Sequence, residues 1–183
     1  MLLFASLAPL PAGAADDIPA STQTSILLKV LSYDRKLPAR VSGVVKIALV
    51  FRPGDPASEA TRQNVGAAFD LASAHFNVAG LTVKTFAVAY TTIAKLEADL
   101  VQEKTTAVYL CDGLTDEVRS IVKLTQAHSI VSFGVTDAYV KAGVSVAVAK
   151  RGSRPAIVIN LKASRAEGAD LDSNLLRLAE IVE

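Results

Sequence analysis

The stretch VVKIALVF, Val44 to Phe51, decides the fold class of this chain. All but one of its residues are apolar and many are β-branched, which is typical of a strand buried on both faces. RPGDPASEA follows, in which Asp55 is a good N-cap and Pro56 suits the first helical position. Helical spacing then predicts an apolar stripe formed by Val65, Ala68, Phe69, Ala72 and Phe76.

The pairing of a strand with a helix repeats along the chain. Strands are predicted in residues 81–90, 106–111 and 129–135, and helices begin near Thr92 and Leu114. Alternation of this kind predicts a parallel sheet that is covered by helices on both faces and joined by right-handed crossovers. We therefore expect an α/β fold: a three-layer sandwich with a mostly parallel sheet of the Rossmann or flavodoxin-like class.

The pattern changes after the fourth strand. TDAYVK has room for a short helical turn only, and GVSVAVAK and RPAIVINL are two strands separated by a hairpin-length loop that contains Gly152. The sheet should therefore end in an antiparallel hairpin, with no helix between Gly143 and Leu161. A C-terminal helix is predicted to start near Asp172 or Ser173. Its buried stripe would consist of Leu175, Leu178, Ala179 and Val182.

Composition limits the class of protein. The chain has 183 residues, of which 51% are hydrophobic and 20% charged, and this excludes a disordered chain and fits one domain. The net charge is +1 and no basic run occurs, so the chain lacks the electrostatic pattern of a nucleic-acid-binding protein. Trp is absent and aromatic residues make up 5%, which also argues against a base-stacking surface.

The first residues resemble an export signal. LLFASLAPL is a short apolar run, and the small residues of 12–14 precede an expected cleavage close to Ala14 or Ala15. We expect a signal peptide over residues 1–15 and one domain over 16–183, in the periplasm and without a transmembrane span. The basic start of such signals is missing, since the first Lys or Arg is Lys29, and an apolar tail is the alternative.

A search for chemistry yields no enzyme signature, cofactor motif or metal motif. There is no GxGxxG, GxSxG or phosphate loop, and His75 and His128 are far apart in sequence. Cys111 is the one cysteine, and it is either a buried small residue or a thiol available for an intermolecular disulfide. We expect a protein that is not an enzyme and needs no cofactor.

One set of polar residues follows the predicted parallel strands, where open α/β sheets bind ligands. They are candidates for a crevice that binds a small solute, or they are ordinary helix caps and turn residues. The set consists of Arg52, Asp55, Ser58, Asp112, Thr115, Thr136 and Asp137.

The two ends of the chain carry the most specific pattern. ILLKVLSYDRKLP predicts an opening helix over about residues 22–36 that Pro38 ends. Near the C-terminus, INL precedes an elbow of small residues and then LLRLA. Both ends resemble the YfiR/HmsC-like family of periplasmic proteins. The matching C-terminal residues are Ile159, Asn160, Leu161, Arg165, Gly168, Ser173, Leu175, Leu176, Leu178 and Ala179.

The chain departs from this family at three points. Leu37-Pro38 stands where many members have Trp-Pro, and Ala142-Gly143 stands where they often have Gly-Gly. The best-known members have cysteine pairs, whereas this chain has Cys111 alone, so a redox-sensing role is not carried over.

The resemblance implies a non-enzymatic periplasmic regulator. The type member represses an inner-membrane diguanylate cyclase by binding its periplasmic domain, which controls cyclic-di-GMP output and biofilm formation; other members are expected to bind sensor kinases. We therefore expect an inner-membrane sensor as the partner, and a homodimer is left open. The candidate partner surface consists of Tyr33, Arg35, Arg165 and Asp170, and the residues given structural roles are Asn160, Gly168 and Ser173.

A second interpretation starts from VFRPGDPASEATRQNV, which resembles the first strand and loop of one lobe of a periplasmic solute-binding protein. Such proteins close two lobes on a ligand, whereas this chain has room for one. The alternative function is therefore that of a single-lobe periplasmic solute-binding protein.

Overall fold

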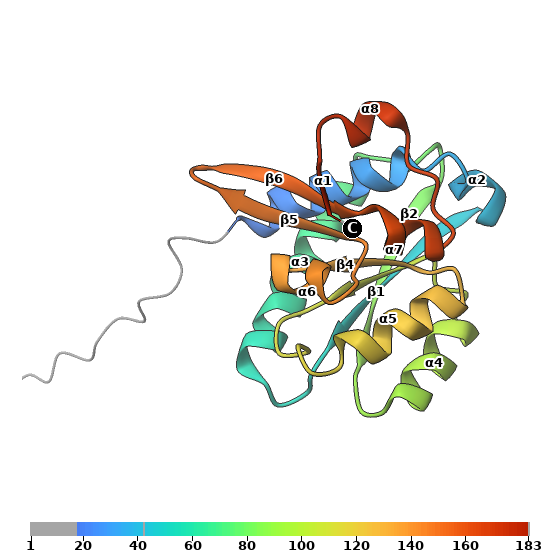
Figure 1. Cartoon of the computed structure of the whole chain (residues 1–183). Helices are drawn as coiled ribbons and strands as arrows, with labels where there is room; N and C mark the ends of the chain where they lie inside the picture. Colours follow the sequence, from blue (N-terminus) through green and yellow to red (C-terminus); the bar gives the residue numbers. More distant parts are fainter. Residues whose placement is uncertain (1–17, 42, 183) are drawn as a thin grey trace, which may run out of the picture.

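A computed structural model describes residues 18–41 and 43–182, so the predicted signal peptide lies outside the described residues. Figure 1 shows a central sheet with helices packed against it. In chain order the elements are α1 (Ala20–Ser32), α2 (Leu37–Arg40), β1 (Val44–Phe51), α3 (Pro56–Ser73), β2 (Thr82–Ala89), α4 (Ile93–Gln102), β3 (Ala107–Leu110), α5 (Val118–Ala127), β4 (Val131–Gly134), α6 (Asp137–Lys141), β5 (Val146–Arg151), β6 (Arg154–Asn160), α7 (Leu161–Ala166), α8 (Ser173–Leu176) and β7 (Glu180–Val182).

The sheet has the strand order β2-β1-β3-β4-β5-β6-β7. The neighbouring pairs from β2 to β5 are all parallel, and β6 runs antiparallel to β5. The predicted α/β class, mostly parallel sheet and C-terminal hairpin are therefore confirmed. The hairpin extends beyond the body of the domain in Figure 1.

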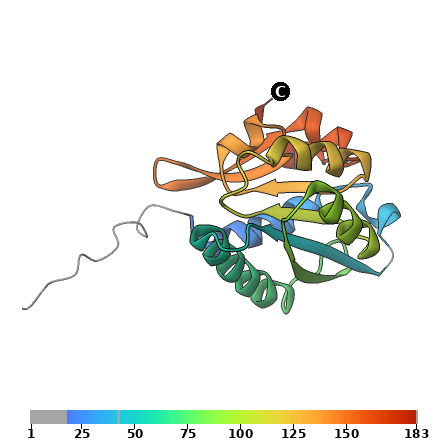
Figure 2. The same cartoon turned by 90° about the horizontal axis from the view of Figure 1, so that it is seen from below.

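Strand β1 shows why this sheet has helices on both faces. Alternate side chains of a strand point to opposite faces. Ile47 and Leu49 pack in one buried cluster with residues of α1 and α3, whereas Ala48 and Val50 pack in another with residues of α4 and α5. Figure 2 shows the helices on either side of the strands. A continuous apolar run is therefore needed here, because neither face of the strand contacts water.

Helix starts follow the predicted capping residues. The Asp55 carboxylate accepts a hydrogen bond from the Ser58 backbone N–H at 2.9 Å, and Pro56 stands in the first turn of α3. The Thr92 hydroxyl accepts one from the Lys95 N–H at 3.2 Å at the start of α4. Each cap satisfies a backbone donor that has no partner within its helix.

The opening helix is shorter than predicted. It spans Ala20–Ser32 instead of about 22–36, because the chain turns at Asp34, whose carboxylate accepts a hydrogen bond from the Lys36 backbone N–H at 3.0 Å. Pro38 does not end this helix; it lies in the first turn of α2, where its missing N–H leaves no hydrogen bond unmade.

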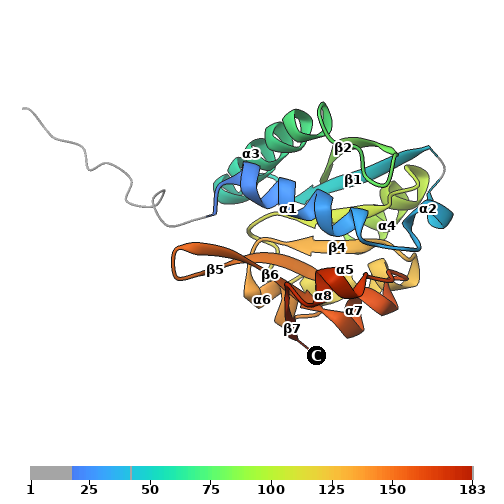
Figure 3. The ribbon, with the colours of Figure 1, turned by 90° about the horizontal axis from the view of Figure 1, so that it is seen from above.

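The predicted C-terminal helix begins at Ser173, as expected, but its predicted continuation to Val182 is wrong. Helix α8 ends at Leu176, and β7 then runs parallel to β6, with Ile181 opposite Ile159. The outer edge of β6 offers backbone groups that need partners, and Glu180–Val182 pair with them. The β-branched Ile181 and Val182 suit a strand. Figure 3 shows β7 beside β6, near the C-terminus.

The leucines of this segment test the corrected structure. Leu175 is 2% exposed in the main core, whereas Leu178 is 75% exposed. We expect Leu175→Ala to lower the free energy of unfolding by about 3 kcal/mol, because it removes buried methyl groups and leaves a cavity. The matched change Leu178→Ala should alter it by less than about 0.5 kcal/mol. Urea unfolding measures both, and equal losses would support the continuous helix instead.

Candidate functional site

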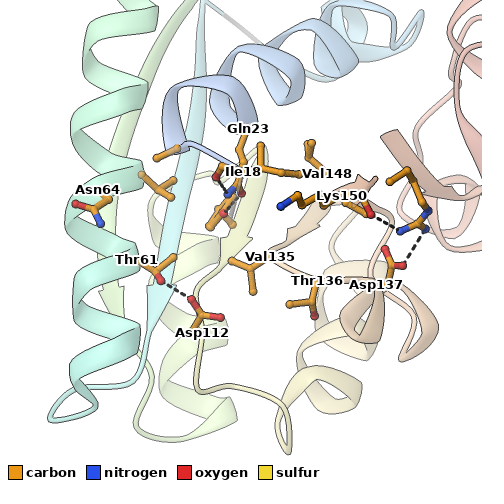
Figure 4. Close-up of a pocket in the computed structure, with 15 residues that line it drawn as sticks. Ile18, Gln23, Thr61, Asn64, Asp112, Val135, Thr136, Asp137, Val148 and Lys150 are labelled. Atoms are coloured by element: carbon orange, nitrogen blue, oxygen red, sulfur yellow. Dashed lines mark hydrogen bonds and ion pairs between the residues drawn. The ribbon is translucent and has the colours of Figure 1, made fainter. Parts of the chain in front are cut away.

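A crevice of about 390 Å³ opens at the carboxyl ends of β3 and β4 (Figure 4). Its walls come from the start of α1, from α3, from the loops that follow β3 and β4, and from the end of β5. The chain crosses from β2 over β1 to β3, so β1 and β3 form the point where the strand order reverses. Ligands of open α/β sheets bind beyond the strand ends at this point.

The floor of the crevice joins the opening helix to the sheet. The Tyr109 hydroxyl donates a hydrogen bond to Gln23 Oε1 at 2.8 Å, and Gln23 Nε2 donates one to the Ile18 carbonyl, also at 2.8 Å. Burial raises the pKa of Tyr109 far above its ordinary value, so its hydroxyl stays protonated and remains a donor. Gln23 and Ile18 were not predicted, because their position depends on how α1 packs across the sheet.

The two carboxylates of the crevice have different partners. Asp112 Oδ2 accepts a hydrogen bond from the Thr61 hydroxyl of α3. Asp137 Oδ2 pairs with the Arg151 guanidinium at 2.8 Å, and the same guanidinium pairs with Glu180 of β7 at 2.8 Å. The charge of Asp137 is therefore neutralised by Arg151, whereas the side chain that donates to Asp112 is the uncharged hydroxyl of Thr61.

Three of the predicted crevice residues line it: Asp112, Thr136 and Asp137. The other four do not, and most of them hold the loop after β1 in place. Arg52 pairs with Glu117 at 2.6 Å and donates to the Gly113 carbonyl at 2.7 Å. The Ser58 hydroxyl accepts from the Arg52 N–H at 2.8 Å. Asp55 is a helix cap, and Thr115 is an exposed residue outside the crevice.

A second set of contacts joins the two ends of the chain. Asp34, which is 2% exposed, accepts a hydrogen bond from the Asp170 N–H at 2.9 Å and pairs with the Arg40 guanidinium. Two backbone hydrogen bonds add to this: the Arg35 N–H to the Asp170 carbonyl at 3.0 Å, and the Asp172 N–H to the Tyr33 carbonyl at 2.9 Å. The opening helix and the C-terminal elbow are therefore one unit.

The predicted partner surface lies on this unit. The side chains of Arg35 and Asp170 pair at 2.8 Å, and the hydrogen bond from Arg35 lowers the pKa of the Asp170 carboxyl, with a smaller contribution from Arg165. Tyr33 is 37% exposed, and Arg165 is also exposed. Residues separated by about 130 positions in the sequence are thus brought to one surface.

The residues given structural roles behave as helix boundaries. Asn160 Oδ1 accepts a hydrogen bond from the Ala163 N–H at 2.9 Å and so caps α7, as predicted. Gly168 follows α7 with φ of +79°, a conformation that favours glycine. Ser173 is the first residue of α8, and the cap itself is Asp172, whose carboxylate accepts from the Asn174 N–H at 2.8 Å.

The most deeply buried carboxylate, Glu167, was not predicted. It is fully buried and accepts hydrogen bonds from the Thr125 hydroxyl at 2.6 Å, from the Ser132 hydroxyl at 2.6 Å and backbone N–H at 2.8 Å, and from the Ser145 hydroxyl. It therefore ties α5, β4 and the start of β5 to the C-terminal segment. The sequence signal that could have indicated a buried partner is the presence of hydroxyl residues within apolar elements, because buried polar groups need a hydrogen-bond partner.

The environment of Glu167 raises the pKa of its carboxyl. Burial raises the pKa of this carboxyl, and the hydrogen bonds from Ser132, Ser145 and Thr125 offset part of that rise because they stabilise the ionised form. Its partners carry no positive charge that would compensate for the lost water.

Cys111 is fully buried, and burial raises the pKa of its thiol to about 12. This supports its interpretation as a buried small residue, because the reactive form is the thiolate. Within residues 18–41 and 43–182, no three of His, Cys, Asp and Glu are grouped so that they could hold a metal ion. None of the helices described there has the length and apolarity needed to span a membrane.

Replacing Glu167 tests its role. Glu167→Ala should lower the free energy of unfolding by about 3 kcal/mol, because it leaves several buried donors without an acceptor. Glu167→Gln keeps one acceptor oxygen and should cost about 1 kcal/mol. Urea unfolding at neutral pH measures both, and an unchanged stability for Glu167→Ala would contradict the burial.

The pH dependence gives a second readout for Glu167. Because its folded pKa is raised, its ionisation disfavours the fold as pH rises from the unfolded value of about 4.3 through the folded value. Wild type should therefore lose stability relative to Glu167→Gln over that range. A gain in relative stability with rising pH would show that the pKa is lowered instead.

Comparison with solved structures gives distant matches in fold. A conserved domain protein from Vibrio cholerae O1 biovar eltor matches with a TM-score of 0.64 and 13% identity, covering 91% of this chain and 61% of that one. An ABC domain in complex with L-Trp from Streptococcus pneumoniae matches with a TM-score of 0.61 and 17% identity, covering 90% and 60%. The ligand-free, open structure of a substrate-binding protein with adhesive properties from Clostridium difficile gives 0.56 and 13%, covering 76% and 54%.

This chain spans about 60% of the length of the first two of these structures. The TM-scores show that these proteins share the fold of this chain, and at such low sequence identity the comparison shows nothing about a shared function. Comparison with curated protein sequences gives no match. A family model described as YfiR/HmsC-like matches residues 24–180, which include most of α1 and most of the residues that line the crevice. The chain therefore belongs to the YfiR/HmsC-like family.

Proposed function

We propose that this protein is a non-enzymatic periplasmic regulator that binds the periplasmic domain of a membrane signalling protein and modulates its output. The observation that carries the proposal is family membership over residues 24–180. The partner would be a diguanylate cyclase or a sensor kinase of the inner membrane. With a cyclase as the partner, cyclic-di-GMP output and biofilm formation would follow from binding.

The joined ends of the chain support a binding role. Tyr33 and Arg35 flank the buried Asp34, which accepts a hydrogen bond from the Asp170 N–H, and Asp170 lies three residues after the buried Glu167. A surface fixed in this way loses little conformational freedom when a partner binds, and this improves affinity. Tyr and Arg are also side chains that protein interfaces favour.

The polar groups of the domain support a structural role over a catalytic one. Asp34 and Glu167 are buried and hydrogen-bonded to neighbouring elements, and Cys111 is buried with a raised pKa. The Arg52–Glu117 pair holds a loop. A regulator needs no reactive group, because it acts by binding one state of its partner more tightly than another. A difference of about 1.4 kcal/mol between the two states changes their ratio tenfold at saturation.

The alternative, a single-lobe solute-binding protein, is favoured by one observation. The crevice lies at the switch point of the sheet, and one of the fold neighbours is itself a substrate-binding protein. This chain covers 54% of that neighbour, so a solute would be bound here without a second lobe to close over it.

The regulator proposal is tested by capture from membranes. The purified domain, immobilised and mixed with detergent-solubilised envelope of its own organism, should retain an inner-membrane sensor. Arg35→Glu should reduce the amount retained at least fivefold, because it reverses a charge on the proposed surface. The matched control is Arg119→Glu, an exposed change on α5 at the opposite face of the sheet, which should bind as wild type does.

Deletion of the gene completes the test. If the partner is a cyclase, deletion should raise cyclic-di-GMP and biofilm formation, and a plasmid copy of wild type should restore both. If no membrane sensor is retained and deletion leaves signalling unchanged, the regulator proposal fails. Thermal unfolding of both variants must match that of wild type. This is expected because the exposed Arg35–Asp170 ion pair contributes about 1 kcal/mol or less, and Arg119 is an exposed residue.

A further inference from the structure

The crevice contains one carboxylate, Asp112, that no described cation neutralises. Its Oδ2 accepts a hydrogen bond from Thr61, and no ion pair joins it to a described Lys, Arg or His. Asp137 differs because Arg151 pairs with it. Asp112 lies at the edge of the sheet where the parallel strands end, because it comes shortly after the last residue of β3.

The surroundings of Asp112 suit a molecule with one polar end. Figure 4 shows Asp112 and Thr61 on one side of the crevice, with Asn64 further along the same helix. The other lining groups near the sheet are largely apolar: Val65, Tyr109, Val135, Val148 and Ala149. Lys150 enters from β5, so cationic groups lie on the β5 wall, across from Asp112.

We propose that this crevice binds a small organic cation, with its protonated amine against Asp112 and Thr61 and its hydrocarbon part against the valine side chains. A carboxylate in a partly closed crevice gains more from a cation than a fully solvated one does, because the effective dielectric constant is lower. The volume of about 390 Å³ is within the range of pockets that hold small ligands.

This inference goes beyond the proposed regulator function and does not depend on it. It concerns the purified domain and a small molecule, so it can fail while partner binding stands, or succeed while partner binding fails.

The test is calorimetric titration of the full domain with hexylamine, with hexanol and hexanoate as the uncharged and anionic controls. Hexylamine should bind, hexanol at least tenfold more weakly, and hexanoate not at all. Asp112→Asn should weaken hexylamine binding at least tenfold. The matched control is Asp116→Asn, an exposed carboxylate outside the crevice, and it should leave the affinity unchanged.

Three results would overturn the proposal: no binding of hexylamine, equal binding of hexanoate, or full affinity in Asp112→Asn. If Asp112→Asn does not fold, amide chemical shifts of the wild-type domain decide the matter. Hexylamine should then shift the amides of residues 109–112 and 135–137. Shifts confined to other parts of the chain would place the amine elsewhere and contradict the assignment.

Discussion

The buried carboxylate of Glu167 is the constraint on which the arrangement of the C-terminal part depends. A carboxylate removed from water is tolerated when donors replace its hydration, and Thr125, Ser132 and Ser145 supply these donors. The three donor residues belong to α5, to β4 and to the chain just before β5. Moving the C-terminal segment would therefore leave polar groups unpaired on three elements at once, and this fixes where that segment leaves the sheet.

A few residues after Glu167, the C-terminal segment contacts the second buried carboxylate, Asp34. Gly168 turns the chain, and the Asp170 N–H then donates to Asp34 at the end of the opening helix. The residues that most closely resemble the family lie near the two ends of the sequence, and the structure brings these ends into contact. The polar residues Asp34, Arg35 and Asp170 therefore hold the two ends of the chain together.

Much of the fold could be predicted because the relevant signals are local. The apolar run of β1, the cap at Asp55 and the loop at Gly152 each specify an element within a few residues. The length of the C-terminal helix was predicted wrongly. Leu175 and Leu178 have helical spacing, but residues 180–182 pair with the open edge of β6 instead of continuing the helix. This strand pairing depends on tertiary structure, so the local sequence pattern could not predict it.

The candidate sites divide in the same way. Asp112, Thr136 and Asp137 were predicted because they follow parallel strands, but strand order alone could not show that Arg52 and Asp55 hold the neighbouring loop. Gln23 and Glu167 were missed because their partners are distant in sequence: Gln23 meets Tyr109, and Glu167 meets Thr125, Ser132 and Ser145. A glutamate in a polar elbow ordinarily faces solvent, so only its partners reveal its role.

Hydrogen exchange measured by NMR on wild type and Glu167→Gln tests most directly whether this carboxylate fixes the position of the C-terminal segment. The account predicts faster exchange at the amides of Asp170, Asp172 and residues 180–182, with α3 unaffected. Val65→Ala, a buried change in α3, serves as a control for general destabilisation, and it should instead loosen α3. Unchanged protection of residues 170–182 in Glu167→Gln would contradict the account, because the C-terminal segment would then be held by something other than Glu167.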